Sequence, residues 1–95
     1  SVYLNDGKGK VGLGKIAVQV YDVNSKLIAK TLTESDGFFS VMGVKPGNYR
    51  VQIDPFQTNK LNLDATPVFL PATIEKSIDG DVEDGLEFIL QPKSN

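Results

Sequence analysis

The residues of this chain that could do chemistry are its acids and lysines, because its 95 residues include no His and no Cys. Those two types supply most ligands of zinc, haem and iron–sulfur centres and most bases and nucleophiles of hydrolases. Glycoside chemistry needs two carboxylates held across a cleft, and no such pair is indicated by the spacing of the acids Glu34, Asp36, Glu75 and Glu87. The composition therefore favours a protein that is not an enzyme, with no catalytic, cofactor-binding or metal-ligating residue assigned.

Two loops carry oxygen ligands of the kind that calcium prefers. The first, at residues 5–10, has one carboxylate, from Asp6, and two lysines, so positive charge stands where ligands would be needed. The second, beside Gly80 and Gly85, is richer in acids: Asp79, Asp81, Glu83 and Asp84. A solvated loop between strands explains both segments, and the sequence leaves open whether the loop from Asp79 to Asp84 binds calcium.

Carbohydrate binding usually relies on exposed aromatic platforms, and the chain has no Trp. Phe38 is one candidate, because the alternation that points Phe39 inward points Phe38 to the other face. Phe56 and Phe69 lie in or near expected loops. An outward Phe more often covers a neighbouring domain than a ligand, so carbohydrate is a weakly supported partner. The glycine-rich run at residues 7–14 is not followed by the Lys-Ser or Lys-Thr step of a phosphate cradle, and we expect a flexible entry to the fold.

The elements that position these acids, lysines and phenylalanines should be strands. Apolar residues recur at every second position in three runs, which is the period of a half-buried strand. The runs are Ile16, Val18 and Val20, then Tyr49, Val51 and Ile53, then Leu86, Phe88 and Leu90. Asp-Gly, Asn-Ser and Pro-Gly steps fall between the runs and suit turns. Turns spaced about 8–12 residues apart are typical of a β-sandwich. We expect strands at residues 2–4, 15–22, 27–33, 38–42, 48–54, 68–70, 73–77 and 86–91, and a long loop at residues 56–65.

One hydrophobic core should serve the whole chain, because 95 residues leave room for a single domain. Its expected members are Leu13, Ile16, Val18, Val20, Ile28, Leu32, Phe39, Val41, Val44, Tyr49, Val51, Ile53, Leu86, Phe88 and Leu90. No apolar stretch is long enough for a membrane helix, and a net charge of −2 argues against nucleic acid as a partner. Since the sequence begins with Ser1 rather than Met, we expect a segment excised from a larger protein.

The segment from Asp36 to Val51 reads DGFFSVMGVKPGNYRV. Its Asp-Gly and Pro-Gly steps make turns, Phe39 points inward between them, and Tyr49 begins a strand after a corner, as in the tyrosine corner of sandwiches. With the opening glycines and the Ile-Val-Val alternation before it, this segment resembles the carboxypeptidase regulatory-like domains, also described as prealbumin-like or collagen-adhesin B-type repeat domains. The resemblance covers residues 2–54.

The resemblance implies a Greek-key, prealbumin-like (Ig-like) β-sandwich of about seven strands. It also implies a non-catalytic spacer, stalk or attachment module of a bacterial cell-envelope or extracellular protein, contacting neighbouring domains or another protein. An accessory carbohydrate-binding module of a hydrolase or transporter is the alternative. Some relatives carry a Lys–Asn isopeptide crosslink. Here the early lysines are Lys8, Lys10 and Lys15, the closing strand has no Asn, and Asn95 lies past Pro92, so we expect solvated lysines instead.

Overall fold

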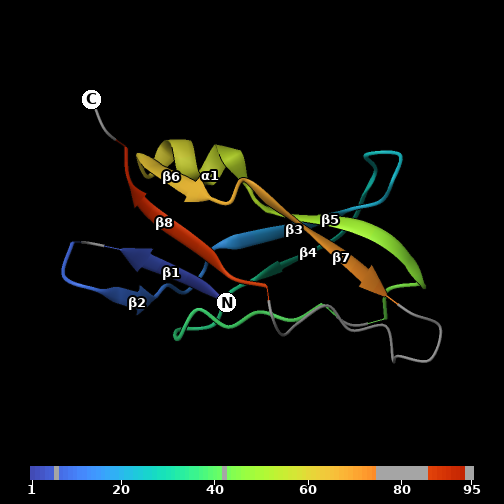
Figure 1. The fold of residues 1–95 in the computed structure, drawn as a ribbon, viewed down its shortest axis with the longest axis horizontal. Coiled ribbons are helices and arrows are strands. Elements are labelled where there is room, and N and C mark those ends of the chain that lie inside the picture. The colour runs from blue at the N-terminus through green and yellow to red at the C-terminus, as the bar shows by residue number, and fades with distance from the viewer. Residues whose placement is uncertain (6, 42, 75–85, 94–95) are drawn as a thin grey trace.

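The computed structural model of the chain describes residues 1–5, 7–41, 43–74 and 86–93, which form two layered β-sheets with a short helix near one end (Figure 1). This arrangement confirms the all-β sandwich predicted from the alternation of apolar residues. The described elements are β1 (Val2–Asn5), β2 (Lys10–Gly12), β3 (Ala17–Tyr21), β4 (Leu27–Leu32), β5 (Gly47–Ile53), α1 (Pro55–Lys60), β6 (Leu63–Thr66), β7 (Phe69–Ile74) and β8 (Phe88–Pro92).

Each sheet has four strands, in the order β2-β1-β8-β6 in the first sheet and β4-β3-β5-β7 in the second. Neighbouring strands are antiparallel except β1 and β8, which run parallel with Val2 beside Phe88 and Leu4 beside Leu90. The first and last described strands are therefore hydrogen-bonded neighbours. Among the described strands the chain changes sheet four times, from β2 to β3, from β5 to β6, from β6 to β7 and from β7 to β8, and the step from β6 to β7 connects two edge strands.

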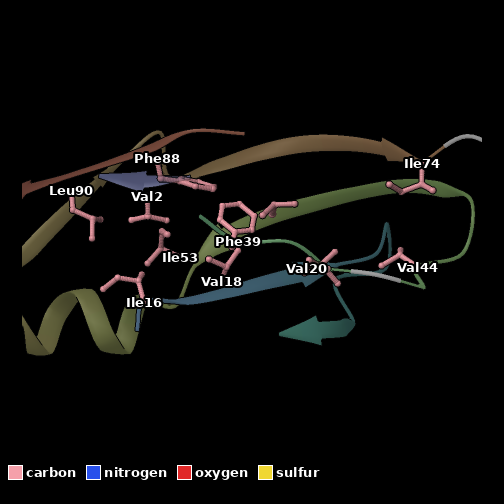
Figure 2. Close-up of a cluster of buried hydrophobic side chains, with 12 residues drawn as sticks. Val2, Ile16, Val18, Val20, Phe39, Val44, Ile53, Ile74, Phe88 and Leu90 are labelled. Carbon is pink, nitrogen blue, oxygen red and sulfur yellow. The ribbon is translucent and has the colours of Figure 1, made fainter. Parts of the chain in front are cut away.

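The core lies between the sheets and is supplied mainly by alternating residues of the strands (Figure 2). Phe39 and Phe88 meet within it, with ring centroids 6.4 Å apart. The predicted core residues that are buried are Ile16, Val18, Val20, Phe39, Val41, Val44, Val51, Ile53, Phe88 and Leu90. Leu13, Tyr49 and Leu86 are half-buried against this cluster. Burying one large apolar side chain contributes about 1.5–3 kcal/mol, so this shared core holds the two sheets together.

The prediction that Ile28 and Leu32 belong to the core is wrong, because both side chains are exposed. The register of β4 on β3 turns Ala29 and Thr31 inward, and a register shift beside Val20 leaves Ile28 as an extra residue. The largest apolar residues of β4 therefore face outward or lie at the bulge. Conversely, the core includes two residues that the sequence does not predict, Val2 and Ile74.

The prediction of a long loop at residues 56–65 is also wrong, because α1 and β6 occupy that stretch. Asp54 is the N-cap of α1, and its side chain accepts a hydrogen bond from the Phe56 N–H at 2.9 Å. Pro55 follows in the first turn, where a missing N–H costs nothing. Among the described residues, no helix has both the length and the apolar character needed to cross a membrane.

The helix is fastened to β3 through one side chain. The Gln57 Oε1 accepts a hydrogen bond from the Ala17 N–H at 2.7 Å, and the Gln57 Nε2 donates to the Lys15 carbonyl at 2.8 Å. The side-chain amide thus pairs with the beginning of β3 as a short piece of strand would. This contact satisfies the N–H of the first residue of β3 and a carbonyl just before the strand.

The strand predicted at residues 38–42 is wrong as far as the structure describes it, because residues 38–41 contain only an isolated bridge at Val41. The Asp36 Oδ1 accepts from the Phe38 N–H at 3.0 Å, and the Phe38 carbonyl accepts from the Glu34 N–H at 2.8 Å. This turn uses backbone groups that a ladder would need. Phe39 and Val41 are nevertheless buried, as predicted.

Two further strand predictions change in detail. The strands expected at residues 68–70 and 73–77 join into the single strand β7, which continues through Pro71. Residues 75–77 of that prediction lie outside the described residues. β2 lies in the glycine-rich run, where the sequence predicts no strand, and pairs with β1 over three residues.

Candidate functional site

A hollow of about 390 Å³ lies beside β4 and is the candidate site of this fold. Ile28 and Ala29 of β4, Tyr49 of β5 and the segment between the two strands line it. Its full lining is Asp22, Ile28, Ala29, Gly43, Val44, Lys45 and Tyr49. We call this hollow the β4 groove. It exists partly because β4 turns the small side chain of Ala29 inward, where a larger residue would fill the space.

Tyr49 holds in place the segment before β5 that lines one side of the β4 groove. Its hydroxyl donates a hydrogen bond to the Lys45 carbonyl, four residues earlier. This is the geometry of the tyrosine corner expected from the sequence, in which a Tyr near the start of a strand bonds back to the preceding chain. The bond spans Pro46 and Gly47, so it fixes the approach to β5 and with it one boundary of the groove.

The turn between β3 and β4 is held by Asp22. Its Oδ1 accepts hydrogen bonds from the N–H groups of Asn24 and Lys26, both at 2.9 Å. This Asx turn is the local reason that the chain reverses here, since the carboxylate replaces a backbone acceptor. Ser25 takes a left-handed conformation, with φ 61°. Asp22 also lines the β4 groove, and its Oδ1 already accepts both hydrogen bonds of this turn.

The outer face of the second sheet carries a separate polar cluster. The Arg50 guanidinium lies 4.8 Å from the centre of the Tyr21 ring, within cation–π range. The Tyr21 hydroxyl donates to the Gln19 Oε1 at 2.9 Å, and the Arg50 Nε donates to the Gln52 Oε1 at 3.2 Å. A second hollow, of about 170 Å³, adjoins this cluster and shares Asp22 and Tyr49 with the β4 groove. The cluster keeps these long side chains ordered on the sheet surface.

The lysines considered for a crosslink do not converge in this structure. The Lys10 Nζ lies 2.9 Å from the Glu87 Oε1, and the hydrogen bond and charge of Glu87 raise the pKa of Lys10 above its ordinary 10.5. Lys15 is exposed, with φ 59°. Lys8 is exposed as well. The amine of a crosslink would have to be buried and neutral, whereas all three of these lysines are exposed.

The acids considered in the sequence are also spread over the fold. Asp36 holds the turn before Phe38, and Glu87 pairs with Lys10. Glu75 and the acidic loop from Asp79 to Asp84 lie outside the described residues. Over the part of the chain that the structure describes, no group of three or more His, Cys, Asp or Glu residues could hold a metal ion.

The three phenylalanines considered for carbohydrate differ in exposure. Phe38 is only partly exposed, whereas Phe56 is 85% exposed and Phe69 is 52% exposed. Phe69 stands beside Gln52 in the β5–β7 ladder, next to the polar cluster. Sequence reasoning missed the β4 groove itself. The sequence signal for the groove is the small residue Ala29 in a strand that also holds larger apolar residues. That signal can be interpreted only when the register of β4 on β3 shows that Ala29 faces inward.

No protein-family model matches this chain, and neither does any curated protein sequence. The resemblance of residues 36–51 to the carboxypeptidase regulatory-like domains therefore supports a proposal about function rather than an assignment.

Proposed function

We propose that this chain is a non-catalytic, prealbumin-like β-sandwich module that acts as a spacer or interaction domain of a bacterial cell-surface or secreted protein. The motif from Asp36 to Val51 supports the family. The observation that carries the mechanical part is the parallel pairing of β1 with β8. A spacer must keep its shape while a longer chain pulls on its two ends, and this pairing determines how such a pull is borne.

Parallel neighbours at the two ends of a chain are loaded in shear. A pull on Ser1 draws β1 toward its N-terminal end, whereas a pull beyond Pro92 draws β8 toward its C-terminal end. The two strands would have to slide past each other, so all hydrogen bonds between them resist together. The Phe88 N–H bonds the Ser1 carbonyl at 2.9 Å, and the ladder continues to Leu90. An antiparallel pair pulled from one end opens one bond at a time instead. The fold is therefore suited to a load-bearing position.

Single-molecule pulling tests the spacer. The chain is placed between two copies of a reference domain and pulled through its N- and C-termini. The matched control pulls between Leu61→Cys and the C-terminus, where β6 and β8 are antiparallel and peel apart from one end. Forced unfolding depends on the unfolding barrier along the pulling direction. We expect a higher force through the termini, and an equal or lower force would contradict the proposal.

A carbohydrate-binding module is the second candidate, and the exposed Phe69 beside the polar cluster of the second sheet favours it. An aromatic ring next to amide and guanidinium groups is a surface on which a sugar ring could stack and form hydrogen bonds. A glycan array decides between the two functions. Binding that is lost in Phe69→Ala or in Phe56→Ala would support the carbohydrate module, whereas the spacer predicts no glycan signal from any of these proteins.

A further inference from the structure

One edge of the second sheet exposes backbone hydrogen-bonding groups. β4 pairs only with β3, and the Thr33 N–H bonds the Ile16 carbonyl at 3.0 Å just beyond the strand. Hydrogen-bonded and non-bonded positions alternate along an antiparallel pair, so Lys30 and Leu32 direct their N–H and C=O groups away from β3. Within the described residues, no other backbone group pairs with them. This edge can therefore accept a further strand.

The other edges are less open. In β7, Pro71 lies opposite Arg50. By the same alternation, the main-chain groups of Pro71 face the free edge of β7, where proline has no N–H to donate to an added strand. β2 is three residues long, and β6 is four residues long with α1 packed against it. β4, by contrast, spans six residues. Edge strands that are short or that contain Pro resist pairing with other chains, so β4 is the favoured edge among the described strands.

The side chains along β4 define what the added strand would carry. On the inward side, the side chain of Ala29 is too small to fill the β4 groove. A large apolar side chain of the added strand could therefore enter the groove there. On the outward side, Lys30 is exposed and forms no ion pair among the described residues. A carboxylate opposite Lys30 would be stabilised across the strands. The complementary sequence therefore alternates an acid with a large apolar residue.

A second copy of this chain fits the edge poorly. The inward residues of β4 are Ala29 and Thr31, which are too small to fill a hollow of about 390 Å³. Pairing two β4 strands with Lys30 opposite Lys30 places like charges together. Pairing Lys30 with Glu34 of the other copy would use a residue whose N–H already bonds the Phe38 carbonyl. The occupant is thus a different sequence.

We propose that β4 binds an extended segment of a partner protein as an added strand, with a large apolar side chain in the β4 groove and a carboxylate beside Lys30. Main-chain hydrogen bonds to Lys30 and Leu32 supply binding, and the groove supplies specificity, as in other cases of strand addition. This inference rests on the proposed interaction role and names the class of partner that the module takes.

The probe is the blocked peptide acetyl-Thr-Thr-Glu-Phe-Glu-Thr-Thr-amide, titrated into the ¹⁵N-labelled chain. We expect the peptide to add antiparallel to β4, because only in that direction does a Glu opposite Lys30 turn its own N–H and C=O groups toward those of Lys30. We expect amide shifts at Leu27–Leu32 and at Gly43 and Lys45. N-methylation of the first Glu, whose N–H faces β4, should weaken binding about tenfold, whereas N-methylation of the Phe, whose N–H faces away, should change it less than about twofold. Replacing the Phe by Ala should also cost about tenfold or more.

Protein variants complete the test. Lys30→Glu should weaken binding of the peptide, and the exposed Lys60→Glu on α1 is the matched control that should leave it unchanged. Absence of shifts at millimolar peptide, shifts at β7 or β6 instead, or indifference to the position of the N-methyl group would each overturn the inference. So would β4 shifts that depend on protein concentration without peptide, since they indicate a second copy. The pulling measurement needs no partner, so failure here with shear resistance retained rejects only the added strand.

Discussion

The hydroxyl of Tyr49 bonds the carbonyl of Lys45 and so holds the turn that introduces β5. Two features depend on this one contact: the entry angle of a central strand of the second sheet, and the boundary of the β4 groove. The aromatic ring adds to the effect because it packs against the core while its hydroxyl faces the exposed turn. Stability and the shape of the groove should therefore change together when the hydroxyl is removed.

Tyr49→Phe should lower the free energy of unfolding by about 0.5–1.5 kcal/mol, the usual net value of a hydrogen bond. Urea unfolding followed by circular dichroism measures the change. Tyr3→Phe is the matched control, because no hydrogen bond of the Tyr3 hydroxyl is found among the described contacts, and it should stay within about 0.5 kcal/mol of the parent. Equal losses in the two variants would show that the corner contributes nothing.

Phe88→Ala should cost about 3–5 kcal/mol, because it leaves a cavity in the core beside Phe39. That is a large part of the roughly 5–15 kcal/mol by which a domain of this size is stable. Thermal unfolding should show a greatly lowered midpoint or no cooperative transition. Phe56→Ala, at an exposed position of α1, should shift the midpoint little. A mild effect at Phe88 would mean that the two sheets do not share this core.

Gly12→Ala should be among the most destabilising small substitutions in the chain. A Cβ built at Gly12 would lie 2.0 Å from the Asp36 carbonyl oxygen, and no side-chain rotation can relieve contact with the main chain. We expect a loss of about 3 kcal/mol or more. Gly7→Ala is the comparison, since a Cβ there meets open space and costs only the strain of φ 90°, about 1–2 kcal/mol. Chemical denaturation that ranks Gly7→Ala as the worse variant would contradict the packing of β2 on the Asp36 turn.

Gln57→Ala should lower stability by about 1–3 kcal/mol, because it leaves the Ala17 N–H and the Lys15 carbonyl without their partner. Gln57→Glu should fall between the parent and the Ala variant, since a carboxylate accepts from Ala17 but donates nothing to Lys15. Hydrogen exchange of the Ala17 amide reports on the contact directly. Gln91→Ala, at an exposed position of β8, serves as the control. Unchanged protection of Ala17 in Gln57→Ala would refute the pairing of helix and strand.

Glu87→Gln should lower the pKa of Lys10, because the hydrogen bond and charge of Glu87 are what raise it above 10.5. Since the folded-state pKa is the higher one, the pair stabilises the fold at neutral pH. That contribution is lost as the pH rises through the pKa of Lys10 in the folded protein. An NMR titration of the Lys10 side chain measures the shift, and 1 M salt should reduce it in the parent. Glu34→Gln is the control that should leave the Lys10 pKa where it is.

The sequence predicts the core-facing residues of strands whose two faces differ clearly, and it assigns them wrongly where the two faces are alike. In β3 and β5, large apolar residues alternate with polar ones, so Val18 and Val51 could be assigned to the core without a structure. In β4, the apolar residues stand on both faces, and a bulge changes the phase at Ile28. Residue type alone could not show that Ala29 and Thr31 face inward.

Short elements were missed for a different reason. α1 has six residues, and its only strong local signal is the Asp54-Pro55 step at its beginning. Its position depends on the hydrogen bonds from Gln57 to β3, which join residues about forty positions apart. The β4 groove depends in the same way on how the segment before β5 packs beside β4. The tyrosine corner could be predicted because it is local, whereas the groove could not because it is tertiary.

The last of the described strands, β8, occupies an interior place in the first sheet, between β1 and β6. As the chain leaves the ribosome or a translocation channel, β3, β4, β5 and β7 can assemble before residues 88–92 appear, but β1 and β6 have no common neighbour until then. Such distant pairings are slow to form. Insertion of β8 should thus be the closing step of folding, and any truncation that removes it should split the first sheet into two separate edges.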